Sequence, residues 1–327
     1  MMIVPYNKPH IPENALKYME KVIENRKFSG DGLFTKKCHE WFNSTFGVKK
    51  SLLTTSCTHA IEIASLLTDI KPGDEVIMPS FTFVSTANAF VLRGAEIVFV
   101  DIRPDTMNMD ENLIEQALSK KTKIIVPVHY AGVSCEMDKI NEIASANDLF
   151  VVEDAAQAMM STYKNRYPGT LGDMGCYSFH ETKNYNAGEG GAILLNKNKF
   201  FEKAEIIREK GTDRAKFFRG ETDKYSWVDM GSSYLPSEFN AAFLYPQLEK
   251  SQQINIQRRR LWENYKKAFL CLEEKYGVKL PCVPEHCSHN GHIFYLVMRS
   301  EEQRESYIRH MKNAGIQTTF HYVPLHS

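Results

Sequence analysis

The sequence predicts an α/β protein with a mostly parallel sheet covered by helices on both faces, followed by a smaller α+β part. Two observations lead to this prediction. Short runs rich in β-branched residues alternate with helix-like segments between residues 51 and 195, and long charged helical patterns dominate after residue 197. In such sheets, ligands bind beyond the carboxyl ends of the strands. We therefore expect the functional residues to follow the strands.

Seven runs have the length and composition of strands: residues 51–55, 75–78, 96–100, 123–128, 150–153, 176–179 and 192–195. The helical patterns between them are residues 58–67, 85–92, 111–118 and 137–146. The alternation predicts βαβ units in one large domain.

The rest of the chain is mainly helical. Residues 200–210 form a charged helical pattern, and Ser237 is placed to cap a helix that Pro246 should end or kink. The further patterns are a long helix over 248–276, strand-like runs at 293–298 and 318–322, and a helix over 303–314. We divide the chain into a large domain, 1–245, and a small domain, 246–327.

Composition excludes several classes of protein. With 40 Lys plus Arg and 40 Asp plus Glu among 327 residues, no net charge favours nucleic acid or an anionic membrane. No apolar run is long enough to span a bilayer, and the N-terminus lacks the pattern of a secretion signal. The seven cysteines show no C-x-x-C spacing, so we expect reduced thiols in a cytoplasmic protein, without a metal site.

Lys183 follows the strand run at 176–179 and precedes a glycine-rich turn at 188–191. A lysine held at a strand end can form an imine with a carbonyl compound once burial favours its neutral amine. Such a lysine is the defining group of enzymes that use pyridoxal 5′-phosphate (PLP). Taken alone, Lys183 would be better explained as a surface lysine, and it is the neighbouring motifs that favour the imine-forming role.

Asp154 ends the apolar run that starts at Phe150. A carboxylate at the tip of a buried strand needs a partner, and the protonated nitrogen of a pyridine ring is one. Strand alternation turns Glu153 to the opposite face, which favours Asp154 for this role. The alternative is an aspartate that caps the next helix.

Ser56, Cys57 and Thr58 stand where the first strand runs into a helix. Free N–H groups at a helix N-terminus bind phosphate, and the hydroxyls of Ser56 and Thr58 can add bonds. Ser178, near the lysine, could reach the same phosphate. Plain helix capping is the alternative.

Aromatic and basic residues complete the candidates. Phe83 could cover the face of a flat cofactor ring, although a core aromatic would fit the pattern as well. His129 and Tyr130, which end a strand run, and His321 and Tyr322 could line the site. Arg214 and Arg219 lie in a polar loop, 211–234, where they could bind the diphosphate of a nucleotide, as could residues 29–32, or could simply be solvated.

In this order and spacing, these motifs resemble the DegT/DnrJ/EryC1/StrS family of sugar aminotransferases, which has the aspartate-aminotransferase fold, fold type I of the PLP enzymes. The resemblance covers nearly the whole chain. Its landmarks are residues 56–60, 73–77, 79–83, 153–157, 178–183, 188–191 and 321–326.

The resemblance implies a role for each residue. Lys183 binds the PLP aldehyde and moves protons, Asp154 pairs with the ring nitrogen, Gln157 contacts the phenolic oxygen and Phe83 stacks on the ring. The phosphate of the cofactor is bound by Cys57, Thr58 and Ser178. The residues expected to bind substrate are Tyr185, Arg214, Arg219, His321 and Tyr322. Where many relatives have an asparagine that reaches the neighbouring subunit's cofactor, this chain has the shorter Ser233.

The implied reaction moves an amino group from L-glutamate to C4 of a dTDP-linked 4-keto-6-deoxyhexose, in a homodimer with shared active sites. Amination at C3, a gluco-configured product and a non-catalytic homologue that acts as a binding partner stay open. Histidine replaces the lysine in the family's sugar dehydratases, so Lys183 argues against that chemistry. The family continues beyond the position of Ser327, so we expect the small domain to be incomplete.

Overall fold

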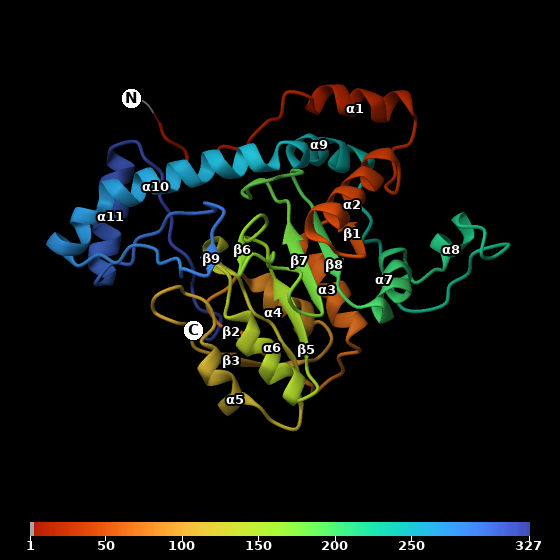
Figure 1. The fold of residues 1–327 in the computed structure, drawn as a ribbon, viewed down its shortest axis with the longest axis horizontal. Helices are drawn as coiled ribbons and strands as arrows, with labels where there is room; N and C mark the ends of the chain where they lie inside the picture. The colour runs from red at the N-terminus through yellow and green to blue at the C-terminus, as the bar shows by residue number, and fades with distance from the viewer. Residues whose placement is uncertain (1–2) are drawn as a thin grey trace.

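A seven-stranded sheet forms the centre of the protein in the computed structural model, which describes residues 3–327 (Figure 1). Its strands are β1 (Lys50–Thr54), β2 (Glu75–Pro79), β3 (Glu96–Val100), β4 (Thr122–Ile125), β5 (Phe150–Asp154), β7 (Met174–Ser178) and β8 (Gly191–Leu195). The strand order is β1-β8-β7-β5-β4-β2-β3, and only β8 runs antiparallel to its neighbours. The predicted α/β class and mostly parallel sheet are confirmed.

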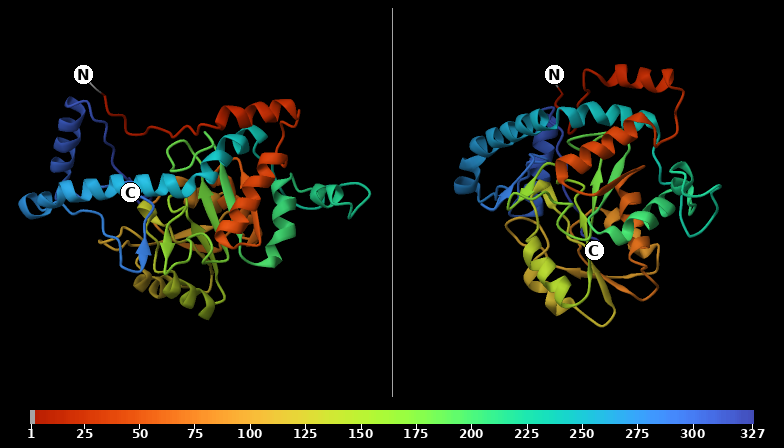
Figure 2. Two further views of the ribbon diagram at one scale, coloured as in Figure 1. Left: turned by 45° about the horizontal axis from the view of Figure 1, so that its top comes forward. Right: turned by 45° about the vertical axis from the view of Figure 1, so that its right-hand side comes forward.

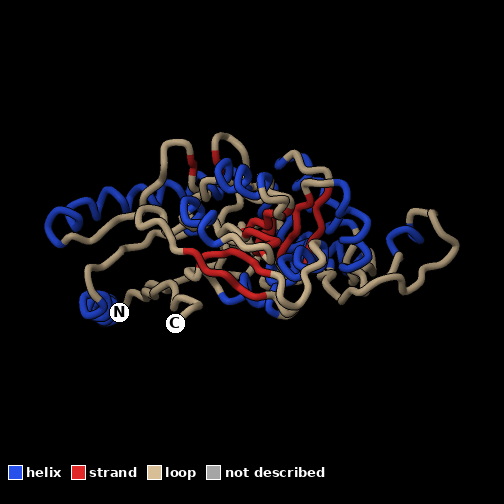
Figure 3. The backbone as a smooth tube through the Cα atoms, turned by 90° about the horizontal axis from the view of Figure 1, so that it is seen from below, coloured by secondary structure: helices blue, strands red, loops and turns tan. Residues whose placement is uncertain are grey.

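The helices around the sheet are α1 (Ala15–Glu24), α2 (Leu33–Phe46), α3 (Cys57–Leu67), α4 (Val84–Val91), α5 (Ile114–Ala117), α6 (Met137–Ala146), α7 (Phe201–Arg208) and α9 (Glu238–Glu249). Short 3₁₀ turns lie at Glu111–Leu113, Tyr130–Gly132 and Asn198–Phe200. Figure 3 shows the strands gathered in the middle of the molecule with helices on both sides.

Strand alternation sends neighbouring side chains into different cores. Val152 packs in the cluster that includes α3, α4 and α7, whereas Val151 packs in the cluster of α5 and α6 on the opposite face. Tyr177 and Leu194 face a third cluster, which joins the sheet to α1, α2 and α9. Burial on both faces explains why the strand sequences are apolar nearly throughout.

Two segments reach away from the sheet at opposite ends of the molecule (Figure 2). One carries the short helix α8 (Arg214–Phe218), and the other holds the long helix α10 (Ser251–Tyr276) and α11 (Glu301–Asn313). The N-terminal segment joins the second group, because Val4 pairs with the backbone on either side of Ile316.

Two predictions about the C-terminal part are wrong. Helix α9 continues through Pro246 to Glu249, because its buried face, which includes Ala242 and Leu248, offsets the missing hydrogen bond of the proline. The runs at 293–298 and 318–322 form no strand, since only Val297 finds a backbone partner, at Lys279. The small two-stranded sheet instead pairs β6 (Thr162–Tyr163) with β9 (Cys287–Ser288). The division of the chain at residue 245 stays a prediction.

None of the helices among residues 3–327 is both long enough and apolar enough to cross a membrane.

Candidate active site

Lys183 lies in the turn that joins β7 to β8. Phe179 and Gly190 pair across this turn, as do Glu181 and Gly188, so the two strands continue as a short ladder beyond the sheet. The Lys183 N–H donates to the carbonyl of His180 at 2.9 Å, which fixes the backbone at the lysine. The lysine therefore projects from a turn that is anchored on two central strands.

The surroundings of Lys183 favour its neutral amine. Burial lowers the pKa of the ammonium group, and the nearby Cys57 and Asp154 partly oppose this shift. A neutral amine has the lone pair that attack on a carbonyl carbon requires. The three side chains come from different parts of the sheet edge, so the fold brings together residues far apart in the sequence.

Asp154 stands at the end of β5, the strand beside β7, with its backbone opposite Cys176. The side chain is 6% exposed. Its Oδ2 accepts a hydrogen bond from the Thr86 hydroxyl at 2.6 Å, and its Oδ1 accepts one from the Ala156 N–H at 3.1 Å. A carboxylate has room for further donors, so Asp154 can still accept one from a ligand.

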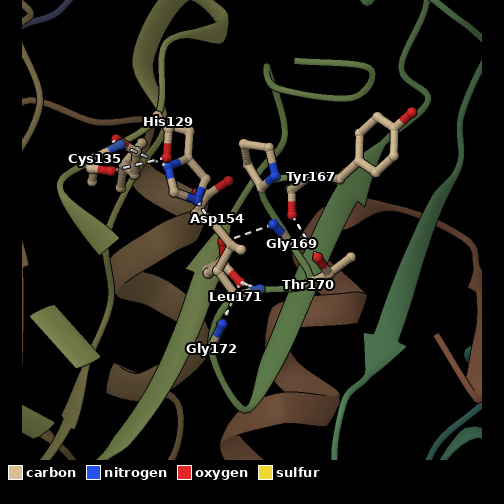
Figure 4. Close-up of polar contacts among 12 residues, drawn as sticks. His129, Cys135, Asp154, Tyr167, Gly169, Thr170, Leu171 and Gly172 are labelled. Carbon is tan, nitrogen blue, oxygen red and sulfur yellow. Dashed lines mark hydrogen bonds and ion pairs between the residues drawn. The ribbon is translucent and has the colours of Figure 1, made fainter. Parts of the chain in front are cut away.

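Glu153 faces the other side of the sheet, as strand alternation predicts. Its Oε1 accepts from the N–H groups of Leu171 (2.7 Å) and Gly172 (2.6 Å), and its Oε2 accepts from the Gly169 N–H (2.7 Å) and His129 Nε2 (2.9 Å). This buried carboxylate holds the loop before β7, whose N–H groups are visible in Figure 4.

His129 belongs to this structural network. Its Nδ1 accepts from the Cys135 N–H at 3.1 Å, so Nε2 is the nitrogen that donates to Glu153 (Figure 4). The ring is fully buried. The prediction that His129 lines the site is therefore wrong.

The segment Ser56–Thr58 forms the expected start of α3. Ser56 is the N-cap, and its Oγ accepts from the His59 N–H at 3.1 Å. Among the described residues, the N–H groups of Cys57 and Thr58 have no hydrogen-bond acceptor. Gly191 passes so close that a Cβ atom there would lie 2.5 Å from the Cys57 nitrogen. Ser178 pairs with Gly191 across the sheet, and its hydroxyl accepts from the His180 N–H at 3.4 Å.

Gln157 and Tyr322 connect the site to the C-terminal segment. Gln157 Oε1 accepts from the Ala131 N–H at 2.7 Å, and its Nε2 donates to the Tyr322 hydroxyl at 2.9 Å. The rings of Phe81 and Tyr130 pack against Tyr322. These contacts build one wall of the site from four separate segments.

His321 lies in the same wall, with Nε2 3.3 Å from the Tyr6 hydroxyl. Burial and the nearby Lys183 charge lower the pKa of its imidazole. His321 is thus held as a neutral group that can exchange hydrogen bonds with a ligand. The structure brings His321 near Lys183 and stacks its ring on that of Tyr322, and their contact with substrate stays a prediction.

Other candidates lie elsewhere in this chain. Tyr185 is a core residue, 1% exposed, whose hydroxyl donates to the Ser251 carbonyl at 3.0 Å, so it does not line the site. Arg214 and Arg219 lie on and directly after α8, paired with glutamates, and Figure 1 shows α8 far from the end of β7. Ser233 is exposed next to that segment. Within one chain these three polar residues do not meet Lys183.

The DegT/DnrJ/EryC1/StrS aminotransferase family matches residues 9–327. The chain belongs to this family. Spore coat polysaccharide biosynthesis protein SpsC of Bacillus subtilis is 32% identical over 99% of the chain and 84% of its own length. GDP-perosamine synthase of Escherichia coli O157:H7 is 29% identical over 100% of the chain and 86% of its own. The putative sugar aminotransferase Spr1654 of Streptococcus pneumoniae, solved in a PLP form, superimposes with a TM-score of 0.89 at 26% identity, covering 99% of the chain and 86% of its own.

As a DegT/DnrJ/EryC1/StrS aminotransferase, the protein uses PLP. The donor set fits this group. The free amides of Cys57 and Thr58 suit its phosphate, the Lys183 amine suits its aldehyde, and the remaining acceptor capacity of Asp154 suits its ring nitrogen. Phe83, 60% exposed at the start of α4, leaves an aromatic face free for stacking.

A further group of polar residues supports the site and escapes sequence analysis. Asn184, next to Lys183, donates to the Asn290 carbonyl at 3.1 Å, and its Oδ1 lies 2.9 Å from His292 Nδ1. Asn290 Nδ2 donates to the carbonyls of Gln157 (2.8 Å) and Met159 (2.9 Å), and its Oδ1 accepts from the His292 N–H (3.0 Å). The segment 290–292 therefore clamps the turns that carry Lys183 and Gln157. Its only sequence signal is an H-N-G-H run in a loop.

Proposed function

We propose that this aminotransferase moves an amino group from L-glutamate to C4 of a dTDP-linked 4-keto-6-deoxyhexose. The product is dTDP-4-amino-4,6-dideoxygalactose, and its use is surface polysaccharide such as enterobacterial common antigen. One observation carries the chemistry: Lys183 and Asp154 share a buried site at adjacent strand ends.

Each residue has a defined task in this proposal. Bound PLP acts as an electron sink that stabilises negative charge at the carbon losing a proton. Lys183 holds the cofactor covalently between turnovers and moves the proton with its ε-amine. Asp154 pairs with the ring nitrogen, and Gln157 contacts the phenolic oxygen. Phe83 stacks on the ring.

The phosphate is held by the N-terminus of α3. The amides of Cys57 and Thr58 donate to it, and the hydroxyls of Ser56 and Ser178 complete the cradle. One site serves both half-reactions, so glutamate and the keto sugar bind in turn. His321 and Tyr322 contact the substrate from the C-terminal wall.

Sequence resemblance supports the choice of sugar. Residues 74–101, 124–138, 180–185 and 231–235 resemble dTDP-4-amino-4,6-dideoxygalactose transaminase. The two relatives named above point the same way in general terms, because one is a synthase of a nucleotide-linked sugar and the other serves polysaccharide biosynthesis.

The experiment is incubation of the protein with PLP, L-glutamate and dTDP-4-keto-6-deoxyglucose. We expect 2-oxoglutarate and a product whose NMR couplings at H4 define a galacto-configured 4-amino sugar. A gluco coupling, an amine at C3, or turnover only with a GDP-linked keto sugar would replace the proposed substrate. A protein that binds PLP but transfers no amino group would favour the binding-partner alternative.

Lys183→Ala provides the matched test of the lysine. We expect loss of the visible absorption of bound PLP and a fall in transamination of more than about a thousandfold, the scale of a lost general acid–base group. Lys139→Ala, on the surface of α6, should retain both. Full activity of Lys183→Ala would remove the assignment.

The proposed enzyme is a cytoplasmic homodimer with active sites at the subunit interface. Its seven cysteines are unpaired, which suits a reducing compartment. Large apolar side chains are exposed on and near α4 and α8, including Leu92 (71%), Phe218 (68%) and Trp227 (81%), and a partner would cover such surface. In this arrangement Arg214, Arg219 and Ser233 serve the partner's site. Light scattering after size exclusion tests the dimer, and a monomer at micromolar concentration would contradict it.

A further inference from the structure

A chain of two buried hydroxyls ends on Asp154. Thr82 Oγ1 lies 2.8 Å from Thr86 Oγ1, and Thr86 Oγ1 lies 2.6 Å from Asp154 Oδ2. The exposed fractions of Thr82, Thr86 and Asp154 are 2%, 0% and 6%. Water therefore has little access to compete with these hydrogen bonds.

The donors and acceptors available to Thr82, Thr86 and Asp154 fix the direction of both hydrogen bonds. A carboxylate only accepts, so the Thr86 hydroxyl must donate to Asp154. Thr86 then has no proton left for Thr82, and the Thr82 hydroxyl must donate to Thr86. Each donation polarises the next hydroxyl, so the two act together on the carboxylate.

The hydroxyl chain has a consequence for the orientation of the Asp154 carboxylate. Thr86 on Oδ2 and the Ala156 N–H on Oδ1 hold the carboxylate plane from two sides. The remaining neighbours that act electrostatically with Asp154 are Cys57, Cys176, Lys183 and Tyr322.

Helix α4 links this pair to the predicted ring-stacking residue. The helix starts directly after Phe83, and the Thr86 N–H donates to the Phe83 carbonyl at 3.1 Å. One helical turn thus sets the position of Phe83 and of the Asp154 carboxylate together. A threonine that merely filled space would need no hydroxyl toward Asp154.

We propose that Thr86, supported by Thr82, is a positioning residue that holds the Asp154 carboxylate aimed at the ring nitrogen of the cofactor. This inference rests on the assignment of Asp154 in the proposed function. It concerns the cofactor alone and is independent of which sugar the enzyme aminates.

The test uses the full chain loaded with PLP that carries ¹⁵N in the ring. The ¹⁵N resonance reports whether the ring nitrogen is protonated. Thr86→Val removes the donor at nearly constant volume, so the carboxylate is held from one side only and its hydrogen bond to the protonated ring nitrogen weakens. We expect the resonance to move toward that of neutral pyridine and PLP to bind roughly tenfold more weakly, the scale of one hydrogen bond to a charged group.

Further variants separate this role from simple packing. Thr86→Ser keeps the hydroxyl and should restore the wild-type resonance. Thr82→Val should shift the resonance in the same direction by a smaller amount, and it provides the test should Thr86→Val fail to fold. Thr68→Val removes another buried threonine hydroxyl, bonded to carbonyls of α3, and should leave the resonance unchanged.

The outcomes distinguish this inference from the proposal beneath it. A protonated ring in the wild type that is unchanged in Thr86→Val and Thr82→Val overturns the role of Thr86 and leaves Asp154 in place. A wild-type ring that is unprotonated, or unaffected by Asp154→Asn, removes the assignment of Asp154 and this inference with it. A shift in Thr86→Val that Thr86→Ser does not restore also overturns the proposal.

Discussion

The Glu153 network allows a quantitative prediction for Glu153→Gln. The carboxylate uses both oxygens, each for two donors: Leu171 and Gly172 on one, Gly169 and His129 on the other. A glutamine offers one oxygen and one NH₂ group, so in either orientation its NH₂ faces two N–H donors. His129 cannot adapt by moving its proton, because Nδ1 already accepts from the Cys135 N–H.

The cost follows from this mismatch. Two charge-assisted hydrogen bonds are lost and two buried donors stay unpaired, which we estimate at about 3–5 kcal/mol. For a chain of 327 residues with an unfolding entropy of about 2.1 cal/mol/K per residue, each kcal/mol lowers Tm by about 1.5 °C, so Glu153→Gln should lower Tm by roughly 4–7 °C. The assay is thermal unfolding followed by circular dichroism, with and without PLP.

Glu142→Gln is the matched control. Its side chain is 73% exposed on α6 and lies 3.6 Å from Lys139, a surface pair worth less than about 1 kcal/mol. We expect its Tm to equal that of the wild type. A Glu153→Gln protein with the same Tm as this control would refute the predicted contribution of the Glu153 hydrogen bonds to stability.

Two further predictions concern the site. Burial lowers the pKa of the Lys183 ammonium below its ordinary value of 10.5, so the neutral amine is present at lower pH than in free lysine. The rate of PLP binding to the apoprotein, measured by stopped flow, should therefore rise with pH and level off below pH 10.5. A midpoint of this pH dependence at or above the pKa of free lysine would contradict the prediction. Asn290→Ala removes three buried hydrogen bonds and should reduce the free energy of unfolding by about 3 kcal/mol in urea, whereas Asn147→Ala, with one side-chain bond to the Ile143 carbonyl, should lose about 1 kcal/mol. Equal losses in the two asparagine variants would show that Asn290 is no clamp.

The sequence predicts the central sheet well because its strands are buried on both faces. All seven predicted strands form, and residues 96–100 match β3 without change. The predicted run 123–128 is too long, since β4 ends at Ile125. Val126 still donates to the Ile77 carbonyl, but Pro127 has no N–H to continue that ladder, and Val128 pairs again only as an isolated bridge to Asp154.

The sequence is less informative where long-range pairing decides the structure. Strand alternation separates Asp154 from Glu153 correctly, because the side-chain period of a strand is local. The burial of Tyr185 and the clamp formed by Asn290 depend on segments more than 60 residues away, which no local pattern reveals. The β-like run at 293–298 likewise required a neighbouring strand to pair with, and within it only Val297 pairs, with Lys279.

The adjacency of β5 and β7 separates what can vary in this enzyme from what cannot. Parallel neighbours lie about 4.8 Å apart, so the hydrogen-bond ladder sets the interval between Asp154 at the end of β5 and the end of β7, from which the turn that carries Lys183 projects. The α8 arm and the loops that flank it contribute nothing to that interval. Evolution, or a protein engineer, can therefore exchange these outer segments to admit a different sugar without changing the spacing of Asp154 and Lys183.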